Sequence, residues 1–227
     1  MKHLTVAIDG PASSGKSTIA KLVANQRGIT YIDTGAMYRA VTLAVLEQQV
    51  DLHKEADVKA LLQSLTIEFK WVEEIQRIWL NGRDVSELVR TVEVTQQVSE
   101  VSANPIVRQE LVALQQQMAT KESVIMDGRD IGTVVLPNAT IKFFFIADVA
   151  VRAERRYKEN MARGLTTQTL EEIQADIQAR DLYDSTREHS PLKQAEDAIL
   201  IDTSAMTMQE VVETLNQLIE KQISDEK

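Results

Sequence analysis

Short apolar runs alternate with amphipathic stretches along most of the chain. Apolar positions recur at helical spacing at residues 16–25, 36–48, 58–65, 106–118, 149–161, 170–183 and 208–219. Short apolar runs typical of buried strands lie at residues 4–8, 29–32, 124–126, 141–147 and 198–201. Strands that alternate with helices predict a five-stranded parallel sheet of the α/β class, with ligands at the carboxyl ends of its strands. Polar residues follow four of these runs, namely Asp9, Asp33, Asp127 and Asp202.

Residues 66–88 break this alternation. Ile67, Phe69 and Trp71 alternate with polar residues, and Asn81-Gly82 lies between two extended stretches. Asn-Gly favours the tight turn of a β-hairpin, because both positions of that turn take positive φ. We therefore predict a small antiparallel β insert at roughly residues 66–103, which holds both tryptophans. The pattern of apolar and polar residues is compatible both with a functional insert and with one that has no role in function.

The composition is that of an ordinary globular protein. With 227 residues, 44% of them hydrophobic and 26% charged, the chain can form one domain with a substantial core and a small insert. The absence of cysteine excludes disulfides and thiolate metal sites, and it fits a reducing compartment. No apolar stretch approaches the ~18 residues of a membrane span, and the N-terminus lacks the long apolar segment of a signal peptide. We expect a cytoplasmic enzyme without membrane contact.

Charge is distributed unevenly along the chain. The formal net charge of −9 argues against a general nucleic-acid binder, since such proteins normally have a basic balance. Yet seven of the thirteen arginines lie between Arg129 and Arg187. Local positive charge in an acidic protein indicates a small anionic ligand.

The residues after the first apolar run match Gly-x-x-x-x-Gly-Lys-Ser/Thr, the phosphate-binding P-loop. Gly10, Gly15, Lys16 and Ser17 stand at its fixed places. Glycines let backbone N–H groups turn toward phosphate oxygens, and the following helix directs its positive end at them. Lys16 would contact the β- and γ-phosphates, and Ser17 would supply a hydroxyl ligand for Mg²⁺. The alternative is an ordinary glycine-rich turn, so the motif predicts a nucleoside triphosphate without naming the reaction.

"DTGAMYR", residues 33–39, ends the second predicted strand and starts a helix. A hydroxyl at a helix start, such as that of Thr34, is most often a cap. Arg39 is harder to explain structurally, because it extends from an otherwise apolar helix near the ligand edge of the sheet.

"VIMDGRDIGTVV", residues 124–135, places two acids and an arginine in a turn that glycine permits. A local salt bridge among Asp127, Arg129 and Asp130 is one interpretation. A guanidinium held between carboxylates is also well oriented for bidentate contact with a phosphate.

Two arginine-rich helical stretches follow. In each stretch, charged residues three or four positions apart lie on one face of the predicted helix. They are Arg152, Arg155 and Arg156 in the first stretch and Arg180, Asp184 and Arg187 in the second. Such stripes are usually solvated surface. In phosphoryl transfer they would neutralise the charge of the migrating group.

Together these motifs resemble the bacterial cytidylate kinases (CMP/dCMP kinases) of the nucleoside monophosphate kinase group, from about residue 4 to residue 220. The resemblance implies transfer of the γ-phosphoryl group of ATP to CMP or dCMP with Mg²⁺. It implies a P-loop kinase core at 1–65 and 104–227, a short helical lid at about 151–165 and a CMP-binding insert at 66–103.

The resemblance also implies roles for individual residues. The ATP phosphates would be bound by Gly10, Pro11, Ala12, Ser13, Ser14, Gly15, Lys16, Ser17 and Thr18, with Ser17 toward the metal. The acceptor would be bound by Thr34, Arg39, Ser99, Arg108, Arg129, Asp130, Arg180, Asp184 and Arg187. Catalytic charge would come from Lys16, Arg129, Arg155, Arg156 and Arg187.

The implied base contacts agree with the chemistry of cytosine. Asp130 can accept from the exocyclic amino group, as acidic residues do in DNA grooves, and Arg108 can donate to the ring acceptors. Uracil would leave Asp130 facing an acceptor, at a cost of ~1–3 kcal/mol per unpaired buried group. Ser102 can take the role of Ser99, and Arg152 and Arg163 compete with the two lid arginines.

Other functions are less well supported by the sequence. A GTPase would carry Asp-x-x-Gly and Asn-Lys-x-Asp motifs, and the chain has neither. A P-loop kinase for another nucleoside monophosphate or a small metabolite is the main alternative. A non-enzymatic module switched by ATP is a weaker one. We expect a monomer that binds ATP and CMP or dCMP and no nucleic acid.

Overall fold

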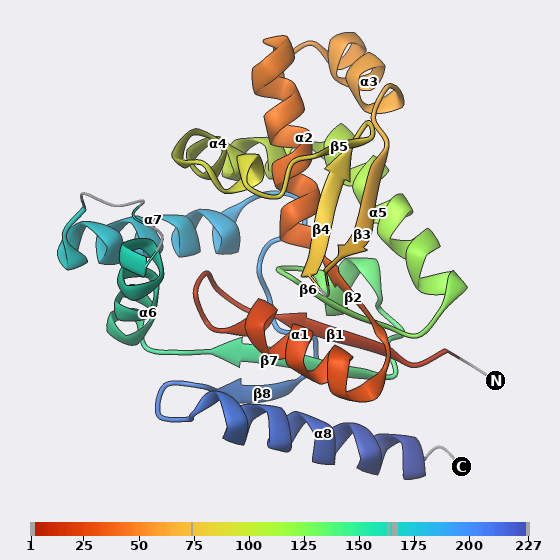
Figure 1. Ribbon diagram of the computed structural model, residues 1–227, viewed down its shortest axis with the longest axis vertical. Coiled ribbons are helices and arrows are strands. Elements are labelled where there is room, and N and C mark those ends of the chain that lie inside the picture. The colour runs from red at the N-terminus through yellow and green to blue at the C-terminus, as the bar shows by residue number, and fades with distance from the viewer. Residues whose placement is uncertain (1–2, 74, 163, 165–167, 226–227) are drawn as a thin grey trace. The chain divides into compact units, whose positions relative to one another are not determined.

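The structure is a computed structural model that describes residues 3–73, 75–162, 164 and 168–225. The chain forms two compact units (Figure 1). The core unit comprises Met1–Tyr31 and Ala119–Lys227, and the second unit comprises Ile32–Met118. Within the described residues, no helix combines the length and the apolar character needed to cross a membrane.

The main sheet has five strands in the order β2-β6-β1-β7-β8, and all but β2 lie wholly in the core unit. Its strands are β1 (Thr5–Asp9), β2 (Thr30–Asp33), β6 (Val124–Gly128), β7 (Ile141–Ile146) and β8 (Ile199–Asp202). The neighbouring pairs β1–β6, β1–β7 and β7–β8 are parallel, and Asp9 lies opposite Gly128 and Phe144. The predicted α/β class and the five predicted strands are therefore confirmed. The carboxyl ends of the central strands form one edge.

Within the part of the chain that the structure describes, four α-helices lie wholly in the core unit: α1 (Lys16–Arg27), α6 (Val149–Ala162), α7 (Leu170–Thr186) and α8 (Met208–Asp225). Alternate strand residues such as Ile8 and Phe143 pack with Ile19 of α1 and Leu215 of α8 in one buried cluster. Because alternate residues of a strand share a face, α1 and α8 cover the same face of the sheet.

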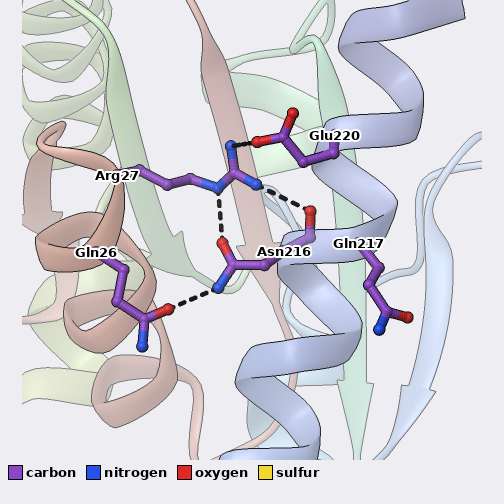
Figure 2. Close-up of a pocket in the computed structure, with 5 residues that line it drawn as sticks. All are labelled: Gln26, Arg27, Asn216, Gln217 and Glu220. Carbon is purple, nitrogen blue, oxygen red and sulfur yellow. Dashed lines mark hydrogen bonds and ion pairs between the residues drawn. The ribbon is translucent and has the colours of Figure 1, made fainter.

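A shallow cavity of about 530 Å³ lies where the end of α1 meets α8. Figure 2 shows Arg27 of α1 directed at two residues of α8. Its guanidinium donates to the side-chain oxygen of Asn216 at 2.7 Å and to its carbonyl at 2.8 Å. It also pairs with Glu220 at 3.0 Å, and Asn216 donates to Gln26 at 2.7 Å. These bonds hold the two helices together at the end of α1 farthest from the P-loop.

An Arg27→Ala variant is expected to lose about 1–3 kcal/mol of unfolding free energy, because two hydrogen bonds from a charged group disappear. Its turnover should stay near that of the wild type, since Arg27 lies at the opposite end of α1 from Lys16. Urea unfolding and steady-state kinetics measure the two quantities. A stable variant with low turnover would contradict this structural role.

The second unit contains a three-stranded antiparallel sheet in the order β3-β4-β5. Its elements are α2 (Thr34–Gln48), α3 (Glu55–Gln63), β3 (Ile67–Val72), β4 (Ile75–Leu80), β5 (Arg83–Asp84), η1 (Leu88–Arg90), α4 (Val92–Ala103) and most of α5 (Pro105–Lys121). Asn81 and Gly82 join β4 to β5 with φ values of 50° and 78°, as a hairpin turn with two positive φ values requires. The predicted antiparallel insert is confirmed over its first half.

The expectation of a sheet throughout residues 66–103 is wrong beyond Asp84. Residues 92–103 form α4, whose buried Val94, Val98 and Val101 follow helical spacing. This helix packs against α2 and η1. The polar-apolar alternation that indicated strands ends before this segment, so its own periodicity was the better guide.

Candidate active site

The P-loop connects β1 to α1 through backbone conformations that glycine favours. Gly10 has a φ of 150°, and a Cβ atom there would lie 2.3 Å from the carbonyl oxygen of Phe145. Gly15, which precedes the first residue of α1, has a φ of 89°, and Ser13 has a φ of 59°. The two glycines of the motif thus stand where a positive φ or close packing requires them.

Lys16 is buried at the first residue of α1. Its ammonium group donates to the carbonyl oxygen of Pro11 at 2.6 Å and to Oγ of Ser14 at 3.2 Å. Burial, and then the nearby Arg129, lower the pKa of Lys16 to about 7, against the opposing effect of Asp127 and Asp9. Arg180 lowers this pKa as well. Both guanidinium groups therefore oppose the charge of the Lys16 ammonium group.

Asp9 ends β1 and holds the turn that follows β6. Its two carboxylate oxygens accept from the backbone N–H groups of Ile131 at 2.8 Å and Gly132 at 2.7 Å. Burial raises the pKa of Asp9 to about 7, although these two hydrogen bonds and Lys16 lower it, while Asp130 raises it further. The turn is η2 (Ile131–Val135), a wide π-type turn of the kind often found at functional sites. The sequence marked Asp9 only by its position after a strand.

Lys16 should make stability rise with pH above neutrality. Since its pKa is about 7 in the folded protein and 10.5 is the ordinary value, the folded state binds fewer protons than the unfolded state between these pH values. The unfolding free energy then rises with pH across this window, by at most about 1.4 kcal/mol per pH unit. Urea unfolding from pH 7 to 10 should show this rise in the wild type and not in Lys16→Met. Equal slopes in both proteins would contradict the lowered pKa.

Asp127 joins β6 to α1 and to β2. Its Oδ2 accepts from the hydroxyl of Ser17 at 2.8 Å, and its Oδ1 accepts from the hydroxyl of Tyr31 at 2.6 Å. The sequence placed Asp127 in a crowded turn without assigning it to a ligand. Its position after a buried strand and next to a glycine was the available signal.

Ser17 and Asp127 together form an oxygen donor set that fits Mg²⁺. The ion usually takes one or two protein oxygens and completes its shell with phosphates and water. Among the described residues, no group of three or more His, Cys, Asp or Glu side chains could hold a metal alone.

Arg129 pairs with an acid far along the chain. Its Nε donates at 2.8 Å to Oδ2 of Asp184, 55 residues away on α7. Arg180 lies 3.9 Å from the same oxygen. Burial alone would raise the pKa of Asp184, but Arg129, Arg180 and Arg187 outweigh it, and the pKa lies below its ordinary value. Asp184 is therefore a charged anchor that orients two guanidinium groups.

Arg187, at the end of α7, completes this cluster. Its Nη2 lies 3.9 Å from Asp130, and it donates to the carbonyl oxygen of Ser190 at 2.6 Å. The side chains of Arg187 and Asp130 are each 5% exposed. The interpretation of the charged residues along α7 as solvated surface is wrong for Asp184 and Arg187, because both side chains are buried.

The arginines of α6 have separate partners. Arg155 donates to the carbonyl oxygen of Thr203 at 2.6 Å and to its hydroxyl at 3.2 Å. Arg156 donates to Oγ of Ser13 in the P-loop at 3.1 Å. Arg152 is 4% exposed and bonds to Ala12 of the P-loop at 3.1 Å. Arg163, the other candidate for the lid, lies outside the described residues.

Four residues predicted to bind the acceptor lie in the second unit, namely Thr34, Arg39, Ser99 and Arg108. Arg108 is 5% exposed, donates to the carbonyl oxygen of Ser102 at 3.1 Å and lies with Cζ 5.5 Å from the centroid of the Tyr38 ring. The hydroxyl of Ser102 donates to the carbonyl oxygen of Ser99 at 3.0 Å. The Ser102 hydroxyl is thus bonded within its own helix, and which of Ser99 and Ser102 contacts the base stays a prediction.

The sequence profile described as Cytidylate kinase matches residues 6–221 of this chain. The chain belongs to the cytidylate kinase family. Cytidylate kinase from Bacillus cytotoxicus is 50% identical over 218 residues, which are 96% of either chain. Cytidylate kinase from Bacillus cereus is 49% identical over 218 residues, with the same coverage. The resemblance inferred from the motifs is confirmed.

Solved structures share the fold of this chain. A shikimate kinase from Bacteroides thetaiotaomicron is 11% identical with a TM-score of 0.50, and the match covers 96% of this chain and 98% of that one. An uncharacterized protein from Eubacterium ventriosum is 14% identical with a TM-score of 0.54 and coverage of 97% and 99%. At these identities the likeness concerns the fold alone.

Proposed function

We propose that this chain transfers the γ-phosphoryl group of ATP to CMP or dCMP and releases ADP with CDP or dCDP. Family membership gives the reaction class. The structural observation that carries the proposal is the cluster around Asp184, which accepts from Arg129 at 2.8 Å and lies 3.9 Å from Arg180. Both guanidinium groups also lower the pKa of Lys16 in the P-loop. A site that gathers several cations is stabilised when polyanionic substrates bind there.

The donor would bind along the P-loop, Gly10–Thr18. Its β- and γ-phosphates would meet backbone N–H groups, the N-terminus of α1 and the ammonium group of Lys16. Ser17 and Asp127 would hold the Mg²⁺ that accompanies ATP. When bound, Mg²⁺ supplies positive charge that neutralises the phosphate oxygens. Arg156, which contacts Ser13, would add a guanidinium on the donor side.

The acceptor would be held by the charged and polar residues that the motifs of the family mark. Arg129 and Arg187 would bind its phosphate together with Thr34 and Arg39. Arg180 and Asp184 would contact the ribose, and Ser99, Arg108 and Asp130 would bind cytosine. The insert at residues 66–103 would contribute to CMP binding through Ser99.

Transfer would be in line, without a covalent enzyme intermediate. No protein base is needed, because the attacking atom is already a phosphate oxygen. The work of the chain is to align the two nucleotides and to neutralise charge on the migrating group. Asp184 keeps Arg129 in one orientation for this task, through its 2.8 Å hydrogen bond.

An acceptor panel tests the proposal. With ATP and Mg²⁺, consumption of ATP should be fastest with CMP or dCMP, and slower with UMP by roughly tenfold to a few hundredfold, because uracil mispairs with Asp130. AMP and GMP should be poorer still. A faster rate with another acceptor would favour the alternative, a P-loop kinase for a different monophosphate or metabolite. Slow ATP consumption with every acceptor would favour an ATP-switched binding module.

Several properties stay predictions of the sequence. They are a monomeric state, a cytoplasmic location and the absence of nucleic-acid and membrane binding. Binding to RNA or DNA that weakens as salt is added would contradict the predicted absence of nucleic-acid binding. Such salt dependence is expected because contacts with phosphates release counterions. Sedimentation of the purified protein tests the first.

A further inference from the structure

Carbonyl oxygens of the P-loop accept hydrogen bonds from side chains. The carbonyl of Pro11 accepts from Lys16 at 2.6 Å, and that of Ala12 accepts from Arg152 at 3.1 Å. The carbonyl of Ser14 accepts from the hydroxyl of Thr203 at 3.1 Å. Lys16 belongs to the motif, whereas Arg152 and Thr203 come from α6 and from the segment after β8.

A bonded carbonyl fixes the direction of the next N–H group. The peptide group is planar and trans, so its C=O and N–H bonds point in opposite directions. Arg152 therefore directs the N–H of Ser13 away from α6, and Thr203 directs the N–H of Gly15 away from β8. Both N–H groups belong to the loop that would surround the donor phosphates.

Arg152 is itself held from three sides. It is 4% exposed, and its Nε donates to the carbonyl oxygen of Ala147 at 2.9 Å. Its Nη1 donates to Oδ2 of Asp181 on α7 at 2.5 Å. A buried guanidinium with these partners has one orientation, so the position of Ala12 is tied to β7 and α7.

Thr203 is fixed in a similar way. It is 3% exposed, and its N–H donates to the carbonyl oxygen of Ile146 at 2.9 Å. Its hydroxyl lies 3.1 Å from the carbonyl oxygen of Ser14 and 3.2 Å from that of Ile146. The Ser14 oxygen is the nearer of the two acceptors for the hydroxyl hydrogen. Arg155 donates to the same hydroxyl oxygen at 3.2 Å and orients it.

We propose that Arg152 and Thr203 are positioning residues for the phosphates of the nucleoside triphosphate. They act through the main chain of the P-loop and touch no substrate. The proposal rests on the proposed function, because it takes the loop as the ATP site. It also assigns Arg152 a different task from that of the lid arginines.

The test compares Thr203→Val, which removes the hydroxyl at nearly constant volume, with Thr203→Ser, which keeps it. Direct titration with Mg-ATP, without acceptor, should show about tenfold weaker binding for Thr203→Val, as expected when one charge-assisted hydrogen bond to phosphate is misaligned. Titration with CMP should stay within about twofold of the wild type. Thr203→Ser should restore ATP affinity. Arg152→Met is expected to weaken ATP binding in the same selective way.

Thr42→Val is the matched control, because Thr42 is a buried threonine whose hydroxyl donates at 2.8 Å to a carbonyl of its own helix. It should bind ATP like the wild type. Unchanged ATP affinity in Thr203→Val, or equal weakening of ATP and CMP, would overturn the proposal. If Arg152→Met does not fold, the threonine variants decide. A wild type that binds ATP but phosphorylates no CMP refutes the proposed function and leaves this test valid.

Discussion

Arg129→Ala is expected to turn over about 10³-fold or more slowly than the wild type while it binds ATP nearly as tightly. An arginine that neutralises the migrating phosphoryl group contributes about 10³–10⁵ in rate in related reactions. Arg129 is suited to that task, because its Nε donates to Asp184 at 2.8 Å and this ion pair orients the guanidinium group. ATP affinity should change little, since the P-loop and α1 carry most of the donor contacts.

Steady-state kinetics with CMP and a separate ATP titration measure the two quantities. Arg129→Lys should recover only part of the lost rate, because a lysine lacks the planar fork that Asp184 orients. Arg27→Ala is the matched control, since it removes another paired arginine of the core unit at the far end of α1. Full activity of Arg129→Ala would remove Arg129 from the mechanism.

Gly10→Ala is expected to weaken ATP binding by about 100-fold or more and to lower the unfolding free energy by about 3 kcal/mol or more. A Cβ atom at Gly10 would lie 2.3 Å from the carbonyl oxygen of Phe145, and the φ of 150° is strained for any L side chain. The contact is with backbone, so no change of rotamer relieves it. The P-loop must move away from β7, and its N–H groups then lose their common direction.

Gly28→Ala provides the control for this effect. Gly28 also has a positive φ, 63°, but a Cβ atom there would meet nothing within 4 Å. The Gly28→Ala variant should lose only about 1 kcal/mol of unfolding free energy, because alanine disfavours a positive φ, and it should bind ATP like the wild type. ATP titration and urea unfolding of both variants separate the close contact from the positive φ. Equal behaviour of the two variants would contradict the role assigned to Phe145.

Local patterns in the sequence were enough for most of the fold. The strands were marked by short apolar runs and the helices by their apolar spacing, and these signals depend only on residues near in sequence. The P-loop was identified in the same way, because Gly10, Gly15 and Lys16 are constrained by the conformation of one short loop. The prediction was wrong at residues 92–103, where strand-like alternation gives way to helical spacing. There it continued the sheet, whereas the structure has the helix α4.

The sequence by itself determined the α/β class, the P-loop, the β4–β5 hairpin and the residue types available for phosphate chemistry. Only the tertiary structure decided which charges meet. Arg129 pairs with Asp184, 55 residues away, and Arg152 bonds to Ala12, 140 residues away. The physical reason is that a charged side chain removed from water must find an oppositely charged or polar partner. The packing of α6 and α7 in the core unit, rather than spacing along the chain, brings those partners within reach.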